Sequence, residues 1–100
     1  MPEYVYLIHP FRHGFFEDPT PRETAVMEAH FKYLKAAAET GTVLLAGPCL
    51  DQTFGLVLLR AADETAAQAF MFDDPSIKEN VMASELHPIQ ISIRGELPAE

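Results

Sequence analysis

One histidine of this sequence lies where general acid–base chemistry would need it. His30 falls inside the apolar arc of a predicted helix, on the same side as Met27 and Leu34. An imidazole held against apolar surroundings is suited to act as a general base near neutral pH, provided that a partner orients its ring. The same pattern is also typical of a structural histidine whose ring is hydrogen-bonded in the core. The residue pattern alone leaves both interpretations of His30 open.

The best candidate partner is Asp74, although an aspartate before Pro75 is also a common N-cap of a helical turn. The two roles are compatible. A carboxylate hydrogen-bonded to His30 would fix the tautomer of the imidazole and raise its basicity. The sequence carries no serine or cysteine nucleophile motif, so water or the substrate itself would be the nucleophile.

The remaining histidines and the single cysteine give weaker signals. His9 and His13 have the spacing that lets a helix bind zinc, but Pro10 lies between them and no third ligand is evident. Cys49 has no CxxC partner and His87 precedes a proline, so structural roles are expected for both. No glycine-rich phosphate loop or dinucleotide fingerprint is present. We therefore expect neither a metal nor a cofactor.

An apolar loop is predicted from residue 10 to residue 19, because this stretch combines prolines and a glycine with three phenylalanines. Such a loop is too apolar to be freely solvated, and we expect it to pack down or to line a pocket. The candidate substrate-binding residues are His9, Phe11, Arg12 and Pro48.

The elements that must position these residues follow the order β-α-β-β-α-β. The first helix has a hydroxyl cap at Thr20, Pro21 at its first position and Glu23 three residues after the cap. The predicted strands cover residues 3–9, 42–46, 54–60 and 85–94, and the predicted helices cover residues 21–41 and 63–72, with a further helical turn or two up to about residue 82.

This order predicts an α+β, ferredoxin-like fold, in which a four-stranded antiparallel sheet carries both helices on one face. Residues of the first helix and residues just after the second helix, such as His30 and Asp74, can then meet. The other face of the sheet is also apolar, because residues 43–45 and 56–59 are apolar without interruption. We expect two copies to cover these faces by packing sheet on sheet as a homodimer, in the manner of a dimeric α+β barrel.

Length and charge narrow the class of protein. One hundred residues are expected to form a single domain, residues 1–100, with a flexible tail over residues 95–100. Seven Lys and Arg against fifteen Asp and Glu give a net charge of −8, which disfavours nucleic acid and anionic membranes as partners. A lone cysteine and the absence of a visible targeting segment favour a cytoplasmic protein.

Three segments resemble the YCII-related (YciI-like) domain family: residues 30–34 (HFKYL), residues 41–48 (GTVLLAGP) and residues 73–75 (DDP). The resemblance implies a ferredoxin-like fold, a dimeric α+β barrel and an active site centred on a histidine and an aspartate, which correspond by position to His30 and Asp74. Ser76 and Asn80 depart from the aromatic residue and the glycine that are common in the family. The loop over residues 10–19 is also longer than the family pattern.

Together these features predict a small enzyme that uses His30 as general acid or base, oriented by Asp74, on a small and partly apolar organic molecule. Isomerisation or hydrolysis fits best. The alternative is a non-catalytic dimer, a small-ligand-binding or stress-response protein in which His30 anchors the ligand. A third possibility is a structural dimer with a buried histidine.

Overall fold

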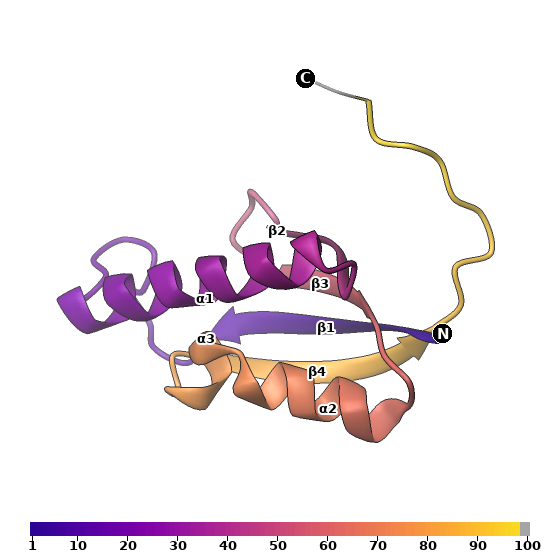
Figure 1. Cartoon of the computed structure of the whole chain (residues 1–100). Coiled ribbons are helices and arrows are strands. Elements are labelled where there is room, and N and C mark those ends of the chain that lie inside the picture. The colour runs from indigo at the N-terminus through magenta and orange to yellow at the C-terminus, as the bar shows by residue number, and fades with distance from the viewer. Residues whose placement is uncertain (99–100) are drawn as a thin grey trace.

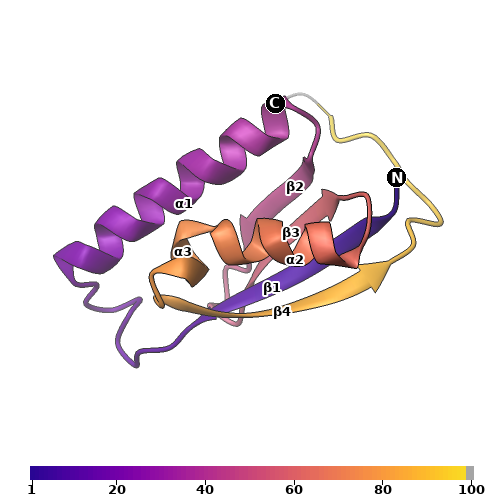
Figure 2. The ribbon, with the colours of Figure 1, turned by 60° about the horizontal axis from the view of Figure 1, so that its bottom comes forward.

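The computed structural model describes residues 1–98 of the chain. The elements follow one another as β1 (Glu3–Pro10), α1 (Pro21–Glu39), β2 (Val43–Pro48), β3 (Gly55–Arg60), α2 (Glu64–Asp73), α3 (Pro75–Lys78) and β4 (Met82–Ile89) (Figure 1). The four strands form one antiparallel sheet in the order β2-β3-β1-β4. The helices cover one face of this sheet, with α1 beside α2 and α3 (Figure 2). The predicted α+β, ferredoxin-like fold is confirmed.

The first helix begins and ends as its sequence predicts. The Thr20 hydroxyl accepts a hydrogen bond from the Glu23 backbone N–H, and the Glu23 carboxylate accepts one from the Thr20 backbone N–H. These reciprocal bonds form a capping box, which satisfies two backbone donors at the helix start. At the other end, Gly41 adopts a positive φ of 84°, and its N–H bonds back to the Ala38 carbonyl. The helix is thereby fixed at both ends.

The core lies between the helices and the sheet. Tyr4, Tyr6 and Ile8 alternate along β1 and point toward the helices, and they pack with residues of β3 such as Val57 and Leu59. From the helical layer, the buried apolar side chains are those of Leu34, Ala67 and Met71. These side chains hold α1 and α2 against the sheet.

The predicted bounds of two strands are wrong. β2 does not end before Gly47, because Gly47 and Pro48 remain paired with Leu56 and Gly55; a proline is tolerated there since β2 is an edge strand. β4 covers residues 82–89 rather than 85–94. Its last pair is Ile89 with Glu3, and β1 begins at Glu3, so the following residues have no strand to pair with.

The segment after β4 leaves the sheet without regular structure up to residue 98, as Figure 1 shows. Ile93 is 93% exposed there, although its alternation with Ile91 predicted a strand. Of the tail predicted over residues 95–100, residues 99–100 lie outside the described part of the chain.

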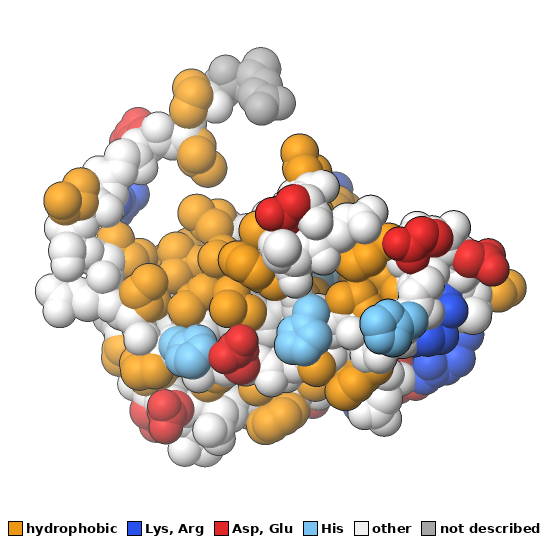
Figure 3. Space-filling view, turned by 180° about the vertical axis from the view of Figure 1, so that it is seen from behind, with side chains coloured by type: hydrophobic (Ala, Val, Ile, Leu, Met, Phe, Trp, Pro, Cys, Tyr) orange, Lys and Arg blue, Asp and Glu red, His pale blue; other side chains and the backbone are white. Residues whose placement is uncertain are grey.

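The face of the sheet that the helices leave open is also apolar. Leu58 lies opposite Val5 on one neighbouring strand and opposite Leu45 on the other. Hydrophobic side chains gather on the side of the molecule drawn in Figure 3, with histidine and acidic side chains at their border. No helix in residues 1–98 is both long and apolar enough to cross a membrane.

Candidate active site

His30 and Asp74 are in direct contact, although 44 positions separate them in the sequence. His30 projects from the middle of α1, and its Nδ1 lies 2.7 Å from Oδ1 of Asp74. Asp74 joins α2 to α3: it caps the end of α2, and its side chain accepts the Ser76 backbone N–H at the start of α3. Pro75 favours the extended backbone of Asp74, which turns the carboxylate toward α1.

The Asp74 carboxylate is fully buried and is surrounded by hydrogen-bond donors. Oδ1 accepts the backbone N–H and the hydroxyl of Ser76, each at 2.9 Å, in addition to His30. Oδ2 accepts the Tyr6 hydroxyl at 2.8 Å. Burial alone would raise the pKa of Asp74, but the hydrogen bond and charge of His30, followed by the bonds from Tyr6 and Ser76, hold its pKa below the usual value. The carboxylate is therefore ionised.

Tyr6 is the third member of this network, and the sequence did not single it out. Its side chain is fully buried in β1, where burial and the nearby Asp74 charge raise the pKa of its phenol far above the ordinary value. The hydroxyl therefore keeps its proton and donates a hydrogen bond to Asp74. The alternation of β1 predicts only that Tyr6 is a core residue. The one signal in the sequence was that a buried tyrosine hydroxyl needs a polar partner.

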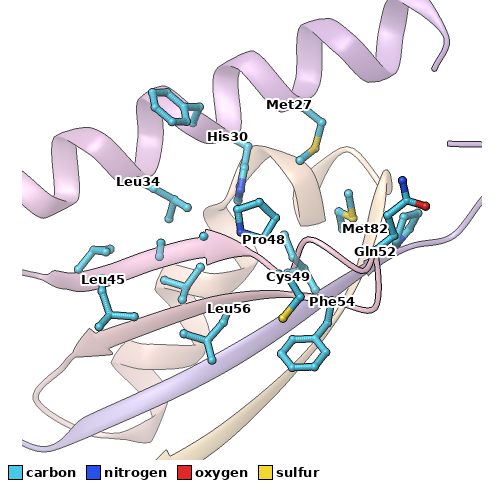
Figure 4. A pocket seen from close by; sticks show the side chains of 18 of the residues that line it. Met27, His30, Leu34, Leu45, Pro48, Cys49, Gln52, Phe54, Leu56 and Met82 are labelled. Carbon is cyan, nitrogen blue, oxygen red and sulfur yellow. The ribbon is translucent and has the colours of Figure 1, made fainter. Parts of the chain in front are cut away.

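The network determines the tautomer of His30. Because the Asp74 carboxylate can only accept, the His30 Nδ1 carries the hydrogen and donates it. In the neutral ring, the other nitrogen, Nε2, then carries the lone pair. Figure 4 shows the His30 ring extending from α1 toward Pro48 at the wall of a cavity. His30 is therefore built as a base that faces this cavity.

The cavity has a volume of about 580 Å³ and lies between α1 and the strands β2 and β3. This volume is in the range of pockets that hold small organic ligands. Most of its wall is apolar and includes Met27 and Leu34 of α1 and Met82 (Figure 4), together with the buried Val43 of β2 and Val57 of β3. Among the described residues that line it, Lys35 carries the one permanent charge.

The loop over residues 11–20 packs down, as predicted, and supplies Phe15 and Phe16 to the wall of the cavity. Arg12 holds the loop against α1, because its Nε and Nη2 each donate to the Glu23 carboxylate at 2.8 Å. Nη2 also donates to the Asp18 carbonyl at 2.7 Å. The hydrogen bond from Arg12, together with that from the Thr20 backbone, lowers the pKa of Glu23 to about 2. Glu23 thus closes the capping box and fixes the loop at once.

Of the four candidate substrate-binding residues, the structure places one at the cavity. Pro48 lines it. The other three lie outside its wall: His9 is exposed at the end of β1, Phe11 is 62% exposed to solvent, and Arg12 is engaged by Glu23. Loop composition identified the segment that reaches the cavity but not which of its side chains point inward.

The other residues that the sequence singled out lie in and around this site as follows. Cys49 is half-buried and contributes to the cavity wall. His87 is exposed and bonds to Glu85 at 2.9 Å. Ser76, which replaces the aromatic residue common in the family, is fully buried and donates to Asp74, so it does not shape the pocket entrance. Within residues 1–98, no group of three or more His, Cys, Asp or Glu side chains is placed to hold a metal ion.

The fold and the site together define an α+β protein with a buried His-Asp pair beside an apolar cavity. The model of the YCII-related domain matches residues 4–86, so the chain belongs to this family. No curated protein matches the sequence.

Among solved structures, the chain is similar to 5-chloro-2-hydroxyhydroquinone dehydrochlorinase from Burkholderia phenoliruptrix AC1100, determined in complex with 2,5-dihydroxybenzoquinone. The TM-score is 0.65 at 18% sequence identity, and the match covers 87% of this chain and 93% of that chain. At this identity the similarity supports the shared fold.

Proposed function

We propose that the protein is a small-molecule enzyme in which His30 is the general base and Asp74 is the residue that orients it. One observation carries the proposal: the ionised, buried carboxylate of Asp74 binds Nδ1–H of His30 and leaves Nε2 free beside the cavity. A base with this orientation is suited to remove a proton from an acidic O–H or C–H group of a bound molecule. Return of the proton to another atom of the molecule completes an isomerisation. Removal of a proton from a water molecule, whose oxygen then attacks the substrate, begins a hydrolysis.

The cavity supports a substrate that is small and largely apolar. Its apolar wall offers few polar groups that would compete with Nε2 for a substrate proton. The related fold of the dehydrochlorinase binds a hydroxylated quinone, a molecule with acidic protons. We therefore include hydroxylated rings and β-dicarbonyl compounds among the substrates to be tested.

Proton exchange tests the proposal whatever the final product of the reaction is. 2,5-Dihydroxybenzoquinone and cyclic 1,3-diketones are incubated in D₂O with the wild type, and the exchange of their carbon-bound hydrogens is followed by NMR. We expect exchange faster than in buffer and a loss of about 100-fold or more in His30→Gln. His87→Gln, which changes an exposed histidine, is the matched control.

The experiment also separates an enzyme from a binding protein. Ligands that bind with changes in the NMR spectrum of the protein, but are neither exchanged nor converted, would contradict the catalytic role of His30 and favour the non-catalytic alternative. Exchange that is equal in wild type and His30→Gln would contradict it as well.

We further propose that the functional unit is a homodimer in the cytoplasm, with the open faces of two sheets packed together. The support is the apolar surface around Leu58, Val5 and Leu45, which a second copy of the same surface would cover. The single cysteine fits a reducing compartment.

A further inference from the structure

The base and the cation of the cavity lie at opposite edges of the α1 surface that lines it. Six residues of α1 line the cavity: Met27, His30, Phe31, Leu34, Lys35 and Ala38. At about 100° per residue, His30 and Lys35 are about 140° apart around the helix axis, and Leu34 lies between them. His30 marks the inner edge of this arc, toward Asp74, and Lys35 marks the outer edge, where it is exposed. A ligand between these edges would meet both residues.

The charge of Lys35 is free for a ligand. The Lys35–Glu39 pair that four-residue spacing favours is not formed, and no ion pair of Lys35 is found among residues 1–98. The whole chain carries a net charge of −8, so an anion approaching it is repelled on average. The cation of Lys35 at the wall of an otherwise apolar cavity therefore attracts an anion locally, although the net charge of the chain repels it.

Aromatic side chains form much of the wall between the two edges. Phe15 and Phe16 come from the loop, and Phe31 comes from α1. Phe31 is 67% exposed, so the face of its ring is accessible to a ligand. Aromatic rings pack favourably against other flat rings at an offset or at an edge. The wall thus favours a planar ring over a branched aliphatic molecule.

We propose that the cavity selects a planar aromatic anion, with its ring among the phenylalanines, its carboxylate or other anionic group at Lys35 and its exchangeable proton at Nε2 of His30. This inference rests on the proposed function for the role of His30. The selection of charge, however, is a property of binding that does not require turnover. Lys35 is then a specificity-determining residue.

Two probes of matched shape test the selection. 4-Hydroxybenzoate carries a carboxylate opposite its phenol, and 4-hydroxybenzamide replaces that carboxylate by a neutral amide of the same size. Their dissociation constants are measured by NMR titration at low and at high ionic strength. We expect the wild type to bind the anion at least about three- to fivefold more tightly than the amide, and we expect salt to reduce the difference.

Variants of the helix assign the preference to one residue. Lys35→Gln is expected to abolish the preference for the anion while leaving the amide affinity within about twofold, and Lys35→Arg is expected to retain it. The control is Lys32→Gln, which changes the net charge of the same helix equally but leaves the cavity wall intact. It is expected to keep the preference.

The outcomes separate the two proposals. Equal affinity of the wild type for both probes, no binding of either, or an unchanged preference in Lys35→Gln would overturn the selection of anions. Proton exchange that does not depend on His30, alongside an anion preference that does depend on Lys35, would overturn the proposed catalytic role alone.

Discussion

Tyr6 of the first strand donates its hydroxyl hydrogen to Oδ2 of Asp74 at 2.8 Å, across 68 positions of sequence, and both side chains are fully buried. Tyr6 thus binds the carboxylate oxygen that makes no hydrogen bond to His30. Asp74 is therefore held from the sheet, from α1 and from its own turn. The orientation of the His30 ring thus depends on packing between layers as well as on the helix that carries it.

Removal of the Tyr6 hydroxyl should weaken the stabilisation of the ionised Asp74 carboxylate without leaving a cavity in the core. In Tyr6→Phe, Asp74 loses one donor, so its pKa is expected to rise toward the usual value. A lowered carboxyl pKa contributes stability above the pKa of the unfolded chain, and this stability is lost as the pH falls through the folded value. The variant should therefore be about 1–2 kcal/mol less stable at neutral pH.

NMR titration of the Asp74 carboxyl carbon and thermal unfolding measure the two effects of Tyr6→Phe. The matched control is Tyr33→Phe, which removes a hydroxyl bonded to the Phe70 carbonyl at 2.8 Å. It should lower stability but leave the Asp74 pKa in place. Equal changes of this pKa in both variants would show that Tyr6 acts on the carboxylate only through general packing.

The exchange of Asp74 for asparagine should remove the charge that holds the tautomer of His30. An amide has the size of the carboxylate, and its N–H₂ group can donate to the Tyr6 hydroxyl while its oxygen takes the place of Oδ1. A neutral amide oxygen holds Nδ1–H less strongly than a carboxylate does, so the tautomer with the hydrogen on Nε2, which cannot act as a base, becomes populated. We expect a loss of activity of about 100-fold or more in Asp74→Asn.

The ¹⁵N chemical shifts of the His30 ring report the tautomer directly. Asp73→Asn changes the exposed neighbouring carboxylate and is the control. It should leave both the tautomer and the proton exchange of 2,5-dihydroxybenzoquinone unchanged. Full activity of Asp74→Asn would contradict the role of Asp74 in orienting the base.

Much of this arrangement could be predicted because it rests on local signals. The capping box at Thr20, the apolar arc around His30 and the aspartate before Pro75 are each encoded within a few residues. With the order of elements, they bring His30 and Asp74 to neighbouring positions. The end of β4 could not be predicted in this way. Its last residue, Ile89, is fixed by pairing with Glu3, where β1 begins, and this pairing leaves no signal near Ile89 in the sequence.

The inner contacts of the site were also beyond local signals. Tyr6 has the pattern of an ordinary core residue, and its role depends on a carboxylate 68 positions away. Arg12 was predicted to bind substrate because it lies in the apolar loop, yet its guanidinium donates two hydrogen bonds to the Glu23 carboxylate. Which charged groups bind each other, and which remain for a ligand, is settled only when the loop packs on the helix.

The Arg12–Glu23 pair should make the loop sensitive to acid. Its hydrogen bond with Arg12, more than that with the Thr20 backbone, lowers the Glu23 pKa from 4.5 to about 2. A lowered carboxyl pKa adds stability at a pH above about 4.5, and this contribution is lost as the pH falls toward 2. In Glu23→Gln, this part of the pH dependence should disappear and the loop should be less protected at neutral pH.

Urea unfolding of the Glu23→Gln variant between pH 7 and pH 2.5, and hydrogen exchange of the loop amides, measure these changes. Glu28→Gln, in an exposed position of the same helix, is the control and should follow the wild type. A wild-type loop whose amide protection does not change across this pH range would contradict a fastening role for Glu23.

The open face of the sheet predicts how copies of the chain associate. Leu58 lies between Val5 and Leu45 on this face, so an aspartate at this position would place a charge in the middle of a sheet-on-sheet interface. A buried charge without a partner costs several kcal/mol. We expect the wild type to sediment as a dimer at micromolar concentration and Leu58→Asp to be a monomer with the circular dichroism of the wild type.

The control is Leu50→Asp, because Leu50 is 95% exposed in the turn before β3, and this variant should remain dimeric. A monomeric wild type, or a Leu58→Asp variant that still dimerises, would show that this face is not the interface.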